Sequence, residues 1–153
     1  MGKNKMSDLQ ELYQQVIIDH GRNPRNFGQL TYANHVKEGY NPLCGDRLMV
    51  YLFEEDGLIR EASFEGSGCA ISMASASLMT EALKGKTIGE ADILFNYFHD
   101  LVTGTGQATE EKLGKLAVLA GVSEYPMRVK CATLCWHTAL AAINDSKELV
   151  STE

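Results

Sequence analysis

Three cysteines and one aspartate have the types and placement that would allow them to bind one metal ion. Cys44 and Asp46 lie in the stretch Asn-Pro-Leu-Cys-Gly-Asp, Cys69 follows Gly-Ser-Gly, and Cys131 follows Arg-Val-Lys. Each cysteine lies in an expected loop or early in an expected helix, where free backbone N–H groups and the helix dipole favour a thiolate. Thiolates are soft ligands for zinc or iron, and a carboxylate adds a harder oxygen. The sequence therefore predicts a shared metal site at Cys44, Asp46, Cys69 and Cys131.

The alternative is that these cysteines are small buried residues of the core. Glycine lies next to Cys44 and Cys69, and neither cysteine is part of an apolar run, which favours the metal site. Cys135 lies one helical turn after Cys131 and has three interpretations. It is a fourth thiol ligand, a spare thiol or, as we expect, a packed core residue.

Two histidines near these elements are not included in the predicted site. His20 lies at the end of an expected helix, where a histidine more often caps the helix or faces solvent. His137 is six residues from Cys131, so that it points to a different helix face.

Length and composition limit the classes of protein that fit. The 153 residues suit one domain with an ordinary core, and we predict a single domain over residues 1–153. The formal net charge of −6 argues against a broad basic surface for nucleic acid. No apolar run approaches the roughly 20 residues that cross a bilayer, and no apolar segment of a signal peptide follows the N-terminus. We expect a cytoplasmic protein, whose cysteines serve as ligands or reactive thiols rather than disulfides.

Two apolar runs around an Asp-Gly pair predict a β-hairpin. The strands are expected over 48–53 and 59–64, with the turn at 55–58. Weak alternation over 32–40 indicates a further short edge strand. The hairpin brings residues 46 and 66 to one end of the sheet, which is why Asp46 and Cys69 are expected to meet.

Helical periodicity and capping signals predict five helices. The first runs from a capping box at Ser7 to Gly21, and the second covers 70–83. The third begins after a capping box at Thr87 and ends at Gly104. The fourth covers 110–120, and the fifth runs from Pro126 through 143. Cys69 then lies at the N-terminus of the second helix, and Cys131 lies early in the last.

The chain resembles the U-type iron–sulfur cluster assembly proteins, the IscU/SufU/NifU N-terminal family. The resemblance covers nearly the whole chain and rests on the residues at 41–46, 66–72 and 130–134, with further similarity at 12–20 and 23–26. The chain is most similar to the SufU branch, since Lys130 stands where IscU-type proteins have histidine and the segment between Cys69 and Cys131 is longer by about one helix. Arg128 matches the SufU pattern, and Cys135 departs from it.

The resemblance implies an α+β fold, with a small, mainly antiparallel three-stranded sheet and about five helices packed on it. It implies that Cys44, Asp46, Cys69 and Cys131 bind Zn²⁺. It further implies that Cys44 accepts persulfide sulfur from a pyridoxal-phosphate-dependent, SufS-like cysteine desulfurase. Downstream iron–sulfur assembly proteins or apo-proteins would then receive the sulfur.

Three other functions stay open on the same residues. An IscU-like scaffold would assemble a [2Fe–2S] cluster and pass it on, and would not be an enzyme, whereas a SufU-type protein would act as a zinc-dependent sulfurtransferase. A structural zinc module would only mediate protein contacts. A thiol oxidoreductase using Cys131 and Cys135 lacks the Cys-x-x-Cys spacing of that class.

Overall fold

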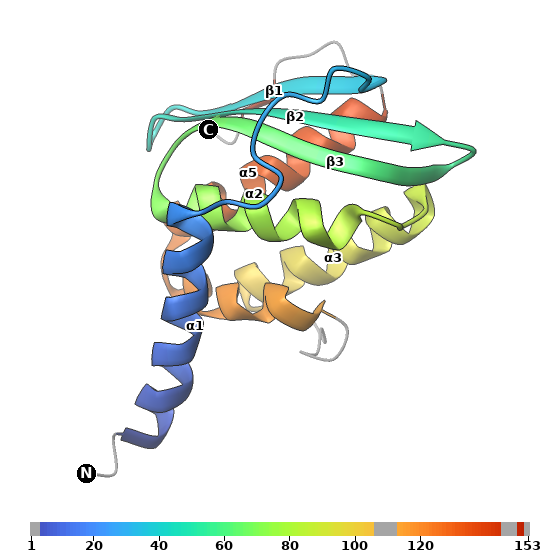
Figure 1. The fold of residues 1–153 in the computed structure, drawn as a ribbon. Coiled ribbons are helices and arrows are strands. Elements are labelled where there is room, and N and C mark those ends of the chain that lie inside the picture. The colour runs from blue at the N-terminus through green and yellow to red at the C-terminus, as the bar shows by residue number, and fades with distance from the viewer. Residues whose placement is uncertain (1–3, 106–112, 145–149, 152–153) are drawn as a thin grey trace.

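The computed structural model of the chain describes residues 4–105, 113–144 and 150–151 (Figure 1). Its elements, in chain order, are α1 (Asn4–Arg22), β1 (His35–Asn41), β2 (Asp46–Glu55), β3 (Leu58–Ser67), α2 (Ala70–Leu83), α3 (Ile88–Thr103), the 3₁₀ helix η1 (Gly114–Glu124), α5 (Pro126–Ile143) and β4 (Val150–Ser151).

Three layers make up the fold. The sheet forms the first layer, α2 and α5 pack against one of its faces, and α3 and η1 pack on the far side of those helices (Figure 1). Helix α1 packs on α2 and η1, and its N-terminal end extends away from the body. The predicted α+β fold is confirmed, with four α-helices and one 3₁₀ helix among the described residues. In the part of the chain that the structure describes, no helix is long and apolar enough to cross a membrane.

The sheet has the order β3-β2-β1-β4, and its three long strands are antiparallel, as predicted. The two-residue strand β4 was not predicted. It pairs in parallel with Gly39 and Tyr40 of β1, and a two-residue strand carries no alternation that a sequence pattern can reveal.

The predicted hairpin is confirmed. Asp56 and Gly57 have φ values of 55° and 78°, the two positive values that a type I′ turn requires. The register pairs Arg47 with Ser67. The start of β2 and the end of β3 therefore lie at the same end of the sheet.

The capping signals at both ends of α3 were predicted correctly, whereas the one at the start of α1 was not. The Thr87 hydroxyl accepts the N–H of Glu90 at 3.1 Å, and the Glu90 carboxylate accepts the N–H of Thr87 at 2.9 Å, so that the capping box is present. The same helix ends at Gly104 in the left-handed conformation. The capping box at Ser7 was wrong as a helix start, because α1 begins at Asn4.

The helix predicted over 110–120 is a 3₁₀ helix from Gly114 on, and residues 110–112 of it lie outside the described part. Three aliphatic side chains of η1 at a spacing of three residues are buried, and they are Leu116, Leu119 and Val122. A 3₁₀ helix has three residues per turn, so this spacing aligns all three on one face. We predicted an α-helix from the apolar positions of this segment, and the structure has a 3₁₀ helix there instead.

His20 is buried rather than solvent-facing, which corrects the sequence interpretation. Its Nδ1 lies 2.7 Å from the Ser77 hydroxyl oxygen, which also accepts the backbone N–H of Arg25 at 2.8 Å. Burial lowers the pKa of His20 below its ordinary value, which favours the neutral imidazole. These bonds fix the end of α1 and the loop after it to α2, the helix that Cys69 caps.

We predict that Gly39→Ala destabilises the fold by on the order of 1–3 kcal/mol. A Cβ at Gly39 would collide with the Thr138 hydroxyl oxygen and lie 3.2 Å from Leu134 Cδ1, both on α5. Urea unfolding of the metal-free protein measures the loss, with Gly121→Ala as the control, because a Cβ there meets nothing within 4 Å. The double variant Gly39→Ala/Thr138→Ala should recover part of the loss. Simply additive losses would mean that the contact with Thr138 is not the cause.

Candidate metal centre

Four different elements supply the four predicted site residues. Cys44 lies in the short loop between β1 and β2, and Asp46 is the first residue of β2. Cys69 is the N-cap of α2, and Cys131 lies in the second turn of α5. The hairpin register and the packing of α5 on β1 and β2 bring these elements to one end of the sheet.

Three of the four residues form a compact group. One ligand atom each from Cys44, Asp46 and Cys131 lies within 4.8 Å of the other two. The Cys131 Sγ lies 3.2 Å from the Cys44 Sγ, and both are free thiols. Cys131 and Asp46 are fully buried, whereas Cys44 is half-buried.

Cys69 lies beside this group and is joined to it through Asp46. The Asp46 Oδ1 accepts the backbone N–H of Cys69 at 2.8 Å. A Cβ at Gly68 would lie 2.6 Å from the same oxygen, so that a side chain there would push the carboxylate away. The Cys69 Sγ accepts the backbone N–H of Ser72 at 3.4 Å and so caps α2.

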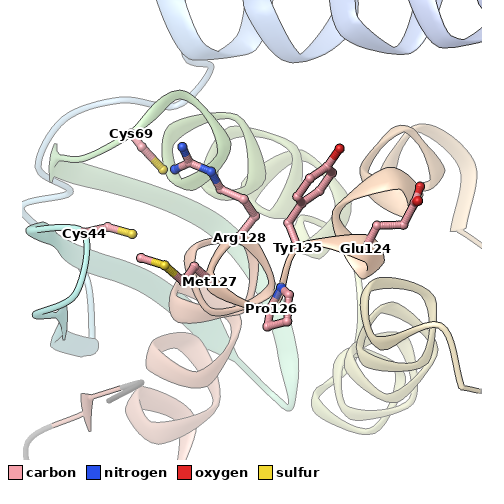
Figure 2. Close-up of a pocket in the computed structure, with 7 residues that line it drawn as sticks. All are labelled: Cys44, Cys69, Glu124, Tyr125, Pro126, Met127 and Arg128. Carbon is pink, nitrogen blue, oxygen red and sulfur yellow. The ribbon is translucent and has the colours of Figure 1, made fainter.

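A pocket of about 480 Å³ opens in front of two of these thiols (Figure 2). Cys44 and Cys69 form one wall, and the turn from η1 into α5 forms the other, with Tyr125, Met127 and Arg128. Arg128 extends its guanidinium group toward Cys69. The site is therefore open to solvent on the side of Cys44 and Cys69 and closed behind Asp46 and Cys131.

Residues 12–132 match the family model described as the NifU-like N-terminal domain. The chain belongs to this family. It is 45% identical over 130 residues to a zinc-dependent sulfurtransferase, SufU, of Bacillus subtilis, covering 85% of this chain and 88% of that protein. It is 38% identical over 141 residues to an iron–sulfur cluster assembly scaffold protein, IscU, of Streptococcus pyogenes, covering 92% of this chain and 88% of that one.

A solved structure gives the same fold. It is that of a putative iron–sulfur cluster assembly scaffold protein for the SUF system from Fervidobacterium islandicum, with a TM-score of 0.79 and 36% identity. The comparison covers 84% of this chain and 93% of that chain. The resemblance stated from the motifs is thus confirmed at the level of the NifU-like N-terminal family.

The buried end of this NifU-like site is unfavourable for a thiolate without a cation. Burial raises the pKa of the Cys131 thiol far above its ordinary value, and hydrogen bonds with Cys44 and Cys69 raise it further. A metal ion reverses this balance, because a coordinating thiol is deprotonated outright. Two sulfurs and a carboxylate oxygen within reach of one another are a donor set that suits zinc.

Arg128 supplies positive charge at the mouth of the site. A hydrogen bond with Cys131 and the charges of Cys69 and Cys131 raise its pKa above the ordinary value. Arg128 is exposed, and its guanidinium group extends toward Cys69, where it can stabilise a thiolate. Tyr125 and Met127 beside it were not singled out, although they are 61% and 53% exposed. The sequence signal that could have identified them is an apolar residue on each side of the first residue of α5.

Cys135 is a core residue, as expected, and is not part of the group. It is fully buried, and its Sγ lies 3.5 Å from the Ser75 hydroxyl of α2. Burial raises the pKa of its thiol to about 12. Cys131 and Cys135 therefore face different partners, which argues against a redox pair.

We predict that the thiols of the reduced, metal-free protein react in an order set by exposure. Cys44 and Cys69 should be alkylated by a maleimide in the folded state, while Cys135 should react only when the protein unfolds, since it is buried and protonated. Timed alkylation followed by peptide mass spectrometry gives each rate, and labelling in urea is the control. Equal rates at Cys44 and Cys135 in the folded protein would contradict the assigned core position.

Proposed function

We propose that this chain is a zinc-binding sulfur acceptor of iron–sulfur cluster assembly, which takes persulfide sulfur from a pyridoxal-phosphate-dependent cysteine desulfurase. The observation that carries the proposal is the group of Cys44, Asp46 and Cys131 beside an open pocket. The similarity to a zinc-dependent sulfurtransferase supports it. We further propose that residues 1–153 form one domain and that the protein works in a reducing cytoplasm, where its thiols stay reduced.

The proposed zinc ligands are Cys44, Asp46, Cys69 and Cys131. The first, second and fourth already lie within reach of one ion, and Cys69 adds the third sulfur at the edge of the pocket. Bound zinc would keep the thiols deprotonated and protect them from random oxidation. Asp46 supplies the one oxygen ligand, which is the harder and more exchangeable donor.

Cys44 is the proposed sulfur acceptor because its thiol is accessible from the pocket. It lies outside regular structure, lines the pocket, and is followed by Gly45, where a Cβ would meet nothing within 4 Å. The Cys44 thiolate would attack the terminal sulfur of the donor persulfide. A new S–S bond forms at Cys44, the S–S bond of the donor breaks, and the donor cysteine leaves as a thiolate.

The rim of the pocket suits a protein partner. Leu43, Tyr125 and Met127 are each more than half exposed around the thiols, and exposed apolar groups of this kind contribute to protein interfaces. Arg128 beside them would stabilise the anionic sulfur during transfer.

The second candidate is a scaffold that assembles a [2Fe–2S] cluster on the same residues. The similarity to IscU scaffold proteins favours it, and thiolate ligands suit iron–sulfur clusters as well as zinc. Metal content and cluster transfer separate the two functions, whereas the position of the ligands does not.

We predict that the protein purified anaerobically holds one tightly bound zinc and stimulates sulfide release by a SufS-like desulfurase. Cys44→Ala should abolish the stimulation, because the attacking sulfur is gone, while Cys135→Ala should keep it as the matched cysteine control. Elemental analysis and a desulfurase assay with and without the protein measure both effects.

The other outcomes discriminate between the candidates. Bound iron with labile sulfide, little stimulation, and transfer of a cluster to an apo-acceptor would establish the scaffold. A Cys44→Ser variant that loses folding stability but still accepts sulfur would indicate a structural zinc module. Protein that binds no metal would refute the proposed site.

We further predict that Asp46→Ala slows sulfur transfer to Cys44 by about tenfold or more. The variant loses the exchangeable oxygen ligand and leaves the Cys69 backbone N–H without its acceptor. Rapid-quench detection of the Cys44 persulfide measures the rate, and Asp92→Ala on the exposed face of α3 is the control. Equal transfer rates for Asp46→Ala and the wild type would show that Asp46 has no role in the reaction.

A further inference from the structure

Asn41 is a fully buried polar residue that the proposed chemistry does not use. It is the last residue of β1 and pairs with Asp46 in the sheet register. Its backbone carbonyl accepts the N–H groups of Cys44 and Gly45 at 3.3 and 2.9 Å, which closes the Cys44 loop. Any residue would supply that carbonyl, so the turn does not explain why the side chain is asparagine.

The side chain of Asn41 points its amide nitrogen at two of the proposed ligands. The Nδ2 lies 3.3 Å from the Asp46 Oδ2 and 3.6 Å from the Cys131 Sγ. A carboxylate accepts hydrogen bonds and cannot donate them, which fixes this orientation of the amide. The Asn41 Oδ1 is buried and has no hydrogen-bond partner among the described residues. A buried amide with an unpaired oxygen is unfavourable. The two contacts of the amide N–H groups must therefore offset the free-energy cost of burying this side chain.

The charge of the proposed site supplies a reason for these contacts. Three thiolates and one carboxylate carry four negative charges against the two positive charges of zinc, and two negative charges remain. Excess charge in a buried site is unfavourable unless hydrogen-bond donors stabilise it. Asn41 faces the two ligands that are fully buried, Asp46 and Cys131, and Arg128 approaches Cys131 and Cys69 from the side of the pocket.

We infer that Asn41 is a positioning residue that stabilises the anionic ligand set and sets how long the metal stays bound. One N–H is directed at the Asp46 Oδ2, whereas the Cys69 N–H bonds the Oδ1, and the other Asn41 N–H is directed at the Cys131 sulfur. The inference rests on the metal site of the proposed function. According to this inference, a residue that is not itself a ligand controls how long the metal is retained.

The test is the rate at which zinc leaves Asn41→Ala. We expect zinc dissociation into a chromophoric chelator to be about 10- to 100-fold faster than from the wild type. The thiolate-to-metal charge-transfer bands of the Co²⁺-loaded protein should also shift, because a hydrogen bond to a ligand sulfur is lost. Asn34→Ala is the control, since the Asn34 side chain bonds the backbone of Glu54 at the far end of β2.

Two further measurements separate this role from a general loss of structure. Urea unfolding of the metal-free variants shows whether Asn41→Ala folds, and if it does not, Asn41→Ser replaces it with the same expected results. In the double variant Asn41→Ala/Asp46→Ala the effects on zinc dissociation should be less than additive, because each change by itself already removes the same hydrogen bond. Additive effects would overturn the contact with Asp46 as the cause.

Wild-type dissociation rates and Co²⁺ spectra in a folded Asn41→Ala protein would overturn the inference while leaving the proposed function intact. The converse outcome is also distinct. A wild-type protein that binds zinc but accepts no sulfur would refute the proposed function, and the effect of Asn41 on metal retention would still be measurable.

Discussion

The hydrogen bond from the Cys69 backbone to the Asp46 carboxylate joins the sheet to the helix behind it, and the rest of the site depends on it. The bond is possible because the hairpin register returns the chain to the start of β2 and because Gly68 leaves room for the carboxylate. It sets the N-terminus of α2 beside the Cys44 loop. The hydrogen bonds of Ser77 with His20 and Arg25 then attach the end of α1 and the loop after it to the same helix. Helix α2 therefore orients both the site and α1.

Burial and charge oppose each other at this site. The inner end is closed, which raises the pKa of the Cys131 thiol and disfavours anions there. Yet the residues at that end are ones that bind metals as anions, and Asn41 turns hydrogen-bond donors toward them. The conflict disappears when a divalent cation is bound, because its charge then compensates the ligands.

Local chemistry in the sequence predicted the parts of the fold that are themselves local. The Asp-Gly turn and the Thr87 capping box each depend on a few adjacent residues, and both are present. His20 was misplaced because its partner, Ser77, is 57 residues away. The period of η1 was misread because the apolar residues at 113, 116, 117 and 120 also fit an α-helical spacing. The meeting of Cys131 with Cys44 depends on how α5 packs against the sheet, which spacing alone does not encode. There the ligand types of the residues, together with the family resemblance, carried the prediction.

Cys131 and Cys135 show what distinguishes a candidate ligand from a core residue in this fold. They lie one turn apart on α5, both are fully buried, and burial raises the pKa of both thiols. Exposure and acidity therefore do not separate them. Their neighbours do: Cys131 meets a second thiol, a carboxylate and an amide donor, whereas Cys135 meets one hydroxyl and the backbone of its own helix. A metal requires several convergent donors, and only the first thiol has them. The chemistry of each cysteine is thus decided by the element packed against its helix face, α2 for Cys135 and the Cys44 loop for Cys131.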